Sequence, residues 1–198
     1  MYYNFEFEPN TLYQELLDEV SFLFKDIYNK DNTSYIMHCK TVANISESLF
    51  NLYFDKEKQT ENMFKILAVL SICHDVYEDI PFENLNNFNS ILSKIEKELS
   101  YNFSFVLIEY LTHNTTYMDR LDYINNIAFN ADFYVKLVKL ADITHNSLVS
   151  RLHVFTLTKA TEKYMKYQRE YSAIFKQLFI ELNSTKQGSE LLREVNGY

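Results

Sequence analysis

The sequence predicts an all-α protein that folds as a single-domain helical bundle. Only two Gly and two Pro occur among its 198 residues, so few positions suit the tight turns that join β-strands. Hydrophobic residues make up 47% of the chain, which is enough for a full core. They recur at three- and four-residue spacing along most of the sequence. We therefore expect residues 1–198 to form one helical domain.

The first predicted helix begins after Asn10 or Thr11, either of which can cap its N-terminus. Its apolar ridge has four-residue spacing and consists of Leu12, Leu16, Val20 and Phe24. These residues predict a helix that packs one face against the core.

A second helix is expected from about Ser34 to Phe54. Its apolar stripe consists of Val42, Ile45, Leu49 and Leu52. His38 shares this stripe, so its side chain is expected to point into the protein. A lone histidine there is usually a core residue held by a hydrogen bond. His38 becomes a candidate ligand only if other groups reach the same interior point.

The third predicted helix carries a dense group of reactive side chains. An apolar run over 66–70 leads into His74, Asp75, Glu78 and Asp79, and Pro81 ends the segment. As one continuous helix, this segment would place those four side chains within an arc of about 140°. One face of the helix would then pack in the core, and the other would carry side chains that can bind a metal or transfer protons. The alternative is an acidic, solvated helix end.

Further helices are expected over about 91–99, 101–111, 117–129, 135–146 and 158–182. The segment 101–111 is strongly apolar and is predicted to be buried, and Thr115 or Thr116 can cap the helix after it. Asp142 follows a strongly apolar stretch, so its carboxylate must be paired, hydrogen-bonded or bound to a metal. A buried salt bridge to a Lys or Arg is the alternative to a metal.

The composition excludes several classes of partner. The net charge of −8 leaves no basic surface of the kind that a nucleic-acid-binding protein needs. The chain has no Gly-rich phosphate loop, so side chains, a metal or helix ends would have to hold a phosphate. No signal peptide or run of about 18 apolar residues is present, and we expect a soluble, cytoplasmic protein without a membrane partner. Cys39 and Cys73 form no CxxC pair and are expected to be small core residues in a reducing compartment.

His38, His74, Asp75 and Asp142 are the strongest candidates for metal ligands. They belong to three separate predicted helices, and the helices of a bundle can converge on one interior point. Two imidazoles and two carboxylates suit Mn²⁺, Fe²⁺ or Zn²⁺ better than Ca²⁺, and the lack of thiolates argues against a structural zinc. Four protein ligands leave room for water or substrate around a six-coordinate ion.

Three sequence motifs occur in the order known from one enzyme superfamily. They are Tyr-Ile-x-His at 35–38, His-Asp-x-x-Glu-Asp at 74–79 and Lys-Leu-Ala-Asp-x-x-His-Asn at 139–146. With these motifs the chain resembles the HD superfamily of metal-dependent phosphohydrolases. In detail it is similar to the hydrolase domain of RelA/SpoT-type enzymes and to the small alarmone hydrolases. The resemblance covers roughly residues 30–150.

The resemblance implies an HD-type helical bundle that binds one divalent metal, usually Mn²⁺, with Zn²⁺ or Fe²⁺ as alternatives. The two histidines and two aspartates named above would be its ligands. Glu78 and Asp79 would position and deprotonate the attacking water and assist the leaving group. Asn146 would contact the substrate. The implied reaction removes the 3′-pyrophosphate from the small nucleotide (p)ppGpp.

A nucleotide with several phosphates needs positive groups near the metal, because the protein itself is acidic. We expect Lys139, which shares a helix face with the aspartate of the third motif, to lie near the phosphates, together with Lys30 and Arg151. His145 is expected to support a metal ligand from behind. His113 lies where dinuclear members of the superfamily place further ligands, but one His does not establish a second metal.

Two other functions stay open. RelA/SpoT-type enzymes have an Arg-Lys pair before the first histidine and Met-Arg after the third motif, whereas this chain has only Lys30 and then Ser147-Leu148. The same metal site would also serve a nucleotidase that acts on nucleoside monophosphates. A non-catalytic nucleotide-binding HD protein is the third interpretation, but it would not need Glu78 and Asp79. The sequence indicates no oligomeric state.

Overall fold

The computed structural model describes residues 7–29, 32–54, 56–152 and 157–184, without the side chains of 149–152, 157–160 and 182–184. Within these ranges the regular elements are helices, and no β-strand occurs. The predicted all-α class is therefore confirmed. None of the described helices is long and apolar enough to cross a membrane.

The helices follow one another through short connections. In chain order they are α1 (Leu12–Leu23), α2 (Tyr35–Tyr53), η1 (Lys56–Lys58), α3 (Glu61–Cys73), α4 (Val76–Asp79), η2 (Phe82–Asn84), α5 (Asn86–Leu99), α6 (Phe103–Val106), η3 (Leu107–Leu111), α7 (Arg120–Asn130), α8 (Phe133–Leu152) and α9 (Leu157–Ser184). The elements η1 and η2 are single 3₁₀ turns, whereas η3 is a turn of π-helix. The helices expected over 34–54, 91–99, 135–146 and 158–182 are all present, the last three over longer ranges.

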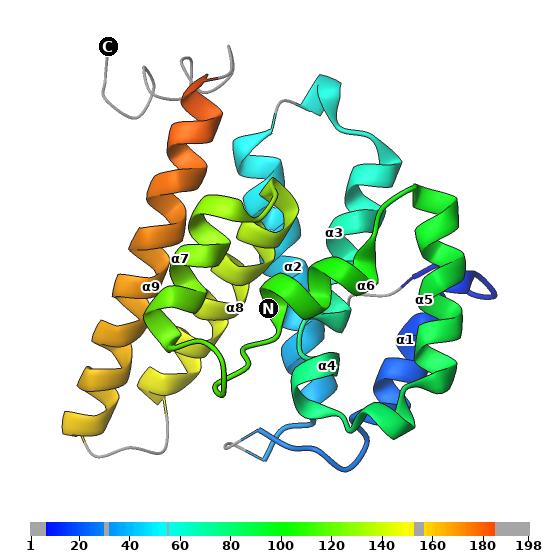
Figure 1. Ribbon diagram of the computed structural model, residues 1–198, viewed down its shortest axis with the longest axis horizontal. Coiled ribbons are helices and arrows are strands. Elements are labelled where there is room, and N and C mark those ends of the chain that lie inside the picture. The colour runs from blue at the N-terminus through cyan, green and yellow to red at the C-terminus, as the bar shows by residue number, and fades with distance from the viewer. Residues whose placement is uncertain (1–6, 30–31, 55, 153–156, 185–198) are drawn as a thin grey trace.

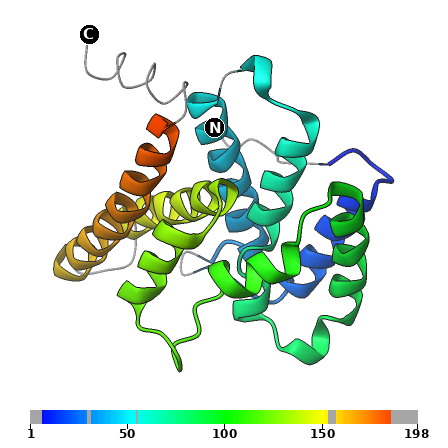
Figure 2. The ribbon, with the colours of Figure 1, turned by 45° about the horizontal axis from the view of Figure 1, so that its top comes forward.

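Helix α8 lies in the middle of the bundle. It packs against α2 and α3 on one side and against α9 on the other, and α7 also packs against α9. At the opposite edge of the molecule α1 packs against α5 (Figure 1). The turned view again places α9 and α5 at the two edges (Figure 2). Side chains from both halves of the molecule can therefore meet at α8.

The first two helices lie where the sequence predicts them. Thr11, rather than Asn10, is the N-cap of α1, because its hydroxyl accepts a hydrogen bond from a backbone N–H three residues later. The buried face of α2 is rotated from the expected stripe, so that Phe50 is buried and Leu52 is 66% exposed. His38 stays on the buried face. The two free cysteines are fully buried core residues, as expected.

The expectation of one continuous helix through His74 and Asp75 is wrong. Helix α3 ends at Cys73 and α4 begins at Val76, with Asp75 at φ −105° and ψ 1° between them. In a continuous helix, adjacent side chains diverge by about 100°, and His74 and Asp75 would not face the same interior point. The break turns both side chains toward the middle of the bundle. The Asp79 N–H then donates to the Asp75 carbonyl at 2.9 Å and starts α4.

The segment expected to be one buried helix over 101–111 is also different. It consists of α6 followed directly by the π-helical turn η3. Phe105 and Ile108 are 54% and 52% exposed, whereas Phe103 and Leu107 are fully buried. Only one face of this apolar segment therefore meets the core.

Helix α7 begins later than the sequence predicted. Asp119 is its N-cap and accepts a hydrogen bond from the Asp122 N–H at 2.9 Å. Thr115 and Thr116 belong instead to the loop between η3 and α7. A carboxylate caps a helix at least as well as a threonine hydroxyl, so the later residue takes the role.

Candidate metal centre and its rim

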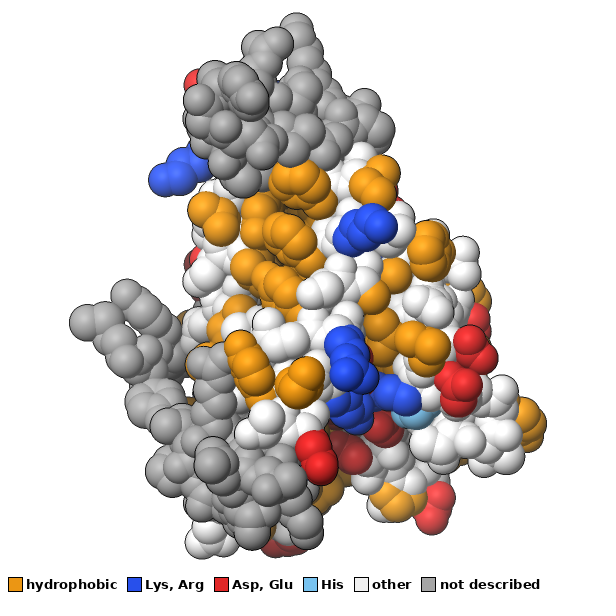
Figure 3. Space-filling model, turned by 90° about the vertical axis from the view of Figure 1, so that its left-hand side faces the viewer, with side chains coloured by type: hydrophobic (Ala, Val, Ile, Leu, Met, Phe, Trp, Pro, Cys, Tyr) orange, Lys and Arg blue, Asp and Glu red, His pale blue; other side chains and the backbone are white. Residues whose placement is uncertain are grey.

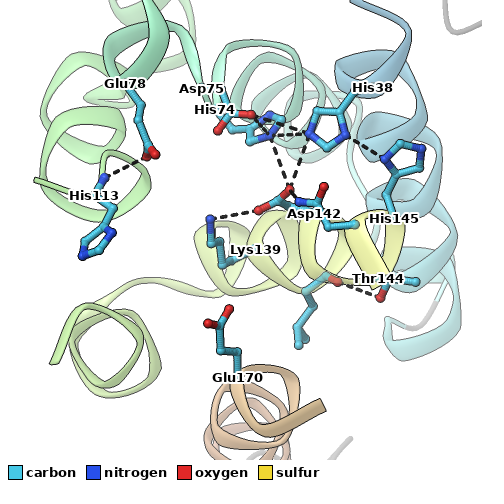
Figure 4. A network of polar contacts seen from close by, with 12 residues as sticks. His38, His74, Asp75, Glu78, His113, Lys139, Asp142, Thr144, His145 and Glu170 are labelled. Carbon is cyan, nitrogen blue, oxygen red and sulfur yellow. Dashed lines mark hydrogen bonds and ion pairs between the residues drawn. The ribbon is translucent and has the colours of Figure 1, made fainter. Parts of the chain in front are cut away.

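Four side chains from three parts of the fold meet in the middle of the bundle (Figure 4). His38 comes from α2, His74 and Asp75 come from the break between α3 and α4, and Asp142 comes from α8. His38, His74 and Asp142 are 3%, 1% and 5% exposed. Each of these three offers a ligand atom, and the three atoms lie within 4.8 Å of one another.

The inward nitrogen of each histidine faces the carboxylates. Nε2 of His38 lies 3.4 Å from Asp142 Oδ1 and 3.6 Å from Asp75 Oδ2. Nε2 of His74 lies 2.8 Å from Asp75 Oδ2 and 3.8 Å from Asp142 Oδ1. The two Nε2 atoms are 3.2 Å apart. The two Nε2 atoms and Asp142 Oδ1 thus form one compact group, and Asp75 Oδ2 lies within 3.6 Å of both nitrogens. We call these four side chains the metal centre.

The other ring nitrogen of each histidine is held by a neighbour. His74 Nδ1–H donates to the Ser71 carbonyl at 2.8 Å. His38 Nδ1 pairs with His145 Nδ1 at 2.7 Å, and His145 lies on α8 behind the centre. When Nδ1 carries the proton, Nε2 keeps a lone pair for a cation. These bonds orient both rings for coordination.

Asp142 uses its two carboxylate oxygens for different partners. Oδ2 accepts from Lys139 Nζ at 2.9 Å in a buried ion pair, and Oδ1 accepts from Asn146 Nδ2 at 2.5 Å. Burial favours the neutral acid, but Lys139 and His38 hold the pKa of Asp142 below its usual range. The buried salt bridge that the sequence offered as an alternative to a metal is present, between Lys139 and Asp142. It uses Oδ2 of Asp142 and leaves Oδ1 directed at the two histidines.

Asp75 is fixed by a tyrosine from the first sequence motif. The Tyr35 hydroxyl donates to Asp75 Oδ2 at 2.6 Å. Burial and the charge of Asp75 raise the pKa of Tyr35, so this hydroxyl keeps its proton. Burial opposes the charge of Asp75 itself, but His74 and His38 hold the pKa of Asp75 well below its usual range. Both aspartates of the centre are therefore anionic at neutral pH.

His38 carries a proton that balances these carboxylates. Burial opposes the imidazolium, but hydrogen bonds with Asp142 and Asp75 outweigh it and raise the pKa of His38 to about 9. A positive charge is therefore favourable where the four side chains meet. A divalent cation would supply that charge and leave both histidines neutral, so the residues fit a site with two nitrogen and two oxygen ligands.

Glu78 and Asp79 lie beside the centre on α4, at the protein surface, and with His113 they form what we call the rim. Glu78 Oε2 accepts from the His113 backbone N–H at 2.9 Å, and Figure 4 shows its carboxylate turned toward His113. Partial burial and the charges of Asp75 and Glu78 raise the pKa of Asp79 to about 6, although a hydrogen bond from Tyr35 opposes this shift. Asp79 therefore exchanges a proton near neutral pH.

His113 lies on the rim and not at the centre. Its Nε2 pairs with the Met118 carbonyl at 3.1 Å, and its ring stacks on Tyr123 with centroids 4.7 Å apart. Among the residues that the structure describes, the group of possible metal ligands does not include His113. A second metal at His113 has no support in this part of the chain.

The positive groups expected around a phosphate are only partly described. Lys30 and the side chain of Arg151 lie outside the described residues. Lys139 is 4% exposed and faces Asp142. Its ammonium group therefore lies directly beside the centre.

Sequence reasoning missed Arg120, at the start of α7. Its Nε and Nη2 donate to the two carboxylate oxygens of Glu170 on α9 at 3.0 and 2.9 Å. Its charge also acts on Asp142 and Lys139, which places it near the centre. On the face of the molecule that Figure 3 shows, Lys and Arg side chains gather beside a His side chain. One signal was available, since Arg120 is the only Lys or Arg between Lys97 and Lys136.

The comparisons with known proteins bear on the fold. No protein-family model matches the sequence, and no curated protein matches it. A solved structure described as a metazoan orthologue of SpoT, which hydrolyses ppGpp and plays a role in starvation responses, is similar with a TM-score of 0.58. The two chains are 19% identical, over 87% of this chain and 88% of that one. The likeness extends over most of both chains, and this protein has an all-α, HD-type helical fold.

Proposed function

We propose that the protein is a metal-dependent nucleotide phosphohydrolase and that its substrate is a guanosine nucleotide with a 3′-pyrophosphate. The convergence of His38, His74 and Asp142 on one buried point, with Asp75 Oδ2 2.8 Å from His74 Nε2, carries the proposal. The three motifs that supply these residues also supply Glu78, Asp79 and Asn146. The similar structure of a ppGpp hydrolase agrees with this assignment.

The chain holds the metal ligands ready for a cation. Ser71 and His145 orient the two imidazoles, while Tyr35 and Asn146 fix one oxygen of each aspartate. The imidazole and carboxylate donors suit Mn²⁺, Fe²⁺ or Zn²⁺, and among these we expect Mn²⁺ because of the resemblance to the HD phosphohydrolases. When bound, such an ion supplies Lewis acidity toward a phosphoryl oxygen and toward water.

We assign the proton transfers of the proposed reaction to the two rim carboxylates, Glu78 and Asp79. In the proposed reaction the water oxygen bonds to the phosphorus next to the ribose, and the bond from that phosphorus to the 3′-oxygen breaks. Asp79 takes the proton from the attacking water at a carboxylate oxygen, a role that suits a pKa of about 6. The 3′-oxygen is the leaving group, and it gains a proton as it separates from the pyrophosphate product. Glu78 positions the water and assists the leaving group.

The nucleotidase alternative is favoured by one observation. Lys139 and Arg120, two positive side chains near the centre, are already paired with Asp142 and Glu170. Fewer free positive charges then face the substrate, and a nucleoside monophosphate needs fewer of them than a nucleotide with two diphosphates.

The test compares the hydrolysis of several nucleotides by the metal-free and by the Mn²⁺-loaded protein. The purified protein is stripped with a chelator, reloaded with Mn²⁺ and assayed for pyrophosphate release from ppGpp, with nucleoside monophosphates and cyclic nucleotides in parallel. We expect pyrophosphate release from ppGpp that is lost on stripping and restored by Mn²⁺. Release of orthophosphate from a monophosphate with no attack on ppGpp would assign the nucleotidase function instead. Binding of nucleotides without any hydrolysis would assign the non-catalytic interpretation.

A further inference from the structure

One buried polar atom near the metal centre has no partner. Tyr123 on α7 is 2% exposed, and within the described part of the chain its hydroxyl is the one buried side-chain oxygen or nitrogen without a hydrogen bond. A buried hydroxyl that lacks a partner is costly, and such groups in native proteins often mark a place where a water or ligand binds. Tyr101, by contrast, donates its hydroxyl proton to Asp132.

Positive and aromatic groups surround this tyrosine. Lys139 Nζ lies 5.5 Å and Arg120 Cζ 5.3 Å from the centre of its ring, and His113 stacks on the ring. We call Tyr123, Lys139, Arg120 and His113 the Tyr123 cluster. The two bonds from Arg120 to Glu170 use Nε and Nη2, so Nη1 takes part in neither. The cluster thus combines an unused hydroxyl donor with two cations, each of which also pairs with a carboxylate, that of Asp142 or that of Glu170.

Lys139 connects Tyr123 with the metal centre, because its Nζ lies 5.5 Å from the centre of the Tyr123 ring and donates to Asp142 Oδ2 at 2.9 Å. Burial raises the pKa of Tyr123, and the charges that act on it most are those of Lys139, Glu78, Arg120 and Asp142. Glu78 belongs to the rim and Asp142 to the centre. A group bound to the hydroxyl would therefore lie next to a phosphoryl group at the centre, and the neutral phenol would donate to it.

We propose that the Tyr123 cluster is an anion subsite that takes the distal phosphoryl group of the pyrophosphate to be removed. This inference rests on the proposed function and adds to it a determinant of substrate class. The phosphorus under attack lies at the metal centre, and the second phosphoryl group accepts the Tyr123 O–H bond with Lys139 and Arg120 beside it. A nucleoside monophosphate has no such second group, so the subsite selects for a diphosphate at the scissile position.

Access to the subsite involves the loop that carries His113. The His113 ring covers one face of Tyr123, and the bond from its backbone N–H to Glu78 holds this part of the loop in place. The proposed subsite requires that this bond be released when a phosphoryl group enters, because the Tyr123 hydroxyl is buried. The same step frees the Glu78 carboxylate for its role at the reacting water.

Tyr123→Phe tests the subsite, because it deletes the hydroxyl and keeps the ring. Tyr101→Phe is the matched control, since it makes the same chemical change at a hydroxyl whose partner is Asp132, outside the Tyr123 cluster and the metal centre. Binding of methylenediphosphonate and of orthophosphate is measured by calorimetry in excess Mn²⁺, so that the ligand does not strip the protein. Thermal unfolding of each variant is recorded alongside.

We expect Tyr123→Phe to weaken diphosphonate binding by about tenfold or more, the scale of one hydrogen bond to a charged group. Orthophosphate binding should stay within about twofold. Thermal stability should be unchanged or higher in Tyr123→Phe, because a buried hydroxyl without a partner is removed, and lower in Tyr101→Phe. Diphosphonate binding equal to that of the wild type, or a loss shared equally with orthophosphate, would overturn the subsite.

The two proposals fail in different ways. If the wild type hydrolyses ppGpp but Tyr123→Phe binds diphosphonate normally, the subsite is wrong and the proposed function stands. If no 3′-pyrophosphate nucleotide is hydrolysed but Tyr123→Phe selectively loses diphosphonate binding, the subsite stands and the proposed function is wrong.

Discussion

The metal centre and the Tyr123 cluster both use α8, but they are built differently. In the centre, Ser71 and Tyr35 each bond a proposed ligand, and Asn146 and Lys139 bond another. In the Tyr123 cluster, the central hydroxyl has no hydrogen bond. The centre is therefore oriented before any substrate arrives, whereas the cluster is complete only with a bound group. Metal binding and substrate binding should accordingly be separable by mutation.

The largest effect is expected at the centre itself. Asp142→Asn removes the negative charge that pairs with Lys139 and with His38. Metal binding should therefore be lost, and turnover should fall by about a thousandfold or more. Lys139 would also lose its buried counter-ion, at a cost of about 3–5 kcal/mol in the free energy of unfolding. Metal content and urea unfolding measure the two losses.

The double variant Asp142→Asn with Lys139→Met separates the loss of metal binding from the loss of stability. It removes the unpaired charge and should recover much of the stability without recovering the metal. Metal bound at wild-type affinity by either variant would show that Asp142 is only a salt-bridge partner.

The next effect concerns the rim. Glu78→Gln and Asp79→Asn should each keep one equivalent of metal and lose turnover by about a hundredfold, the usual scale for acid–base groups. The amide oxygen that Glu78→Gln introduces can still accept from the His113 N–H, so the loss in this variant would be chemical and not a loss of the loop contact. Steady-state assays at saturating Mn²⁺ measure turnover. Wild-type rates in both variants would place the proton transfer elsewhere.

A smaller effect is expected behind the centre. His145→Ala leaves His38 Nδ1 without its partner at 2.7 Å, and metal affinity should fall by about ten- to a hundredfold. Turnover at saturating metal should change little. His145→Gln offers an amide oxygen to the same N–H and should recover part of the affinity. Competition with a chelating dye measures the affinity, and equal values for wild type and His145→Ala would remove His145 from this role.

The mildest perturbation is a change of pH. Because the pKa of His38 is raised to about 9 in the folded, metal-free protein, a metal must displace one proton at neutral pH. Apparent metal affinity should fall by about tenfold for each pH unit below 9.

The same shift affects stability. The proton on His38 stabilises the metal-free fold fully below about pH 6.5, and this contribution is lost as the pH rises toward 9. Metal-loaded protein should not show this loss. Thermal unfolding of both forms across pH 6–10 makes the comparison, and parallel curves would contradict the assigned proton.

The sequence indicated which side chains of the candidate metal centre come together better than it indicated their surroundings. His38, His74 and Asp142 could be selected because each is a polar residue within an apolar segment, and burial of such a residue needs a reason. The helical class followed from apolar spacing and the scarcity of Gly and Pro. Both inferences depend on local patterns, which the chain carries in its sequence.

The break between His74 and Asp75 could not be predicted in this way. No Gly or Pro marks it, and periodicity favoured a helix that continues to Asp79. The break is stabilised by contacts from elsewhere, such as the bond from Tyr35 to Asp75. Tyr123 and Arg120 were missed for a related reason, since their significance comes from Lys139 and Glu170, which are distant in the sequence.

The position of α8 between the two sides of the bundle has a consequence for folding. The ligands from α2 and from the break after α3 lie early in the chain, whereas Asp142 is supplied by α8, near the end of the motif region. A chain that is still emerging from the ribosome lacks the last ligand until α8 has been synthesised and docked. Tight metal uptake should therefore coincide with completion of the core, because contacts distant in sequence form late. The bound ion would then stabilise the core after it has assembled, and it would not nucleate folding.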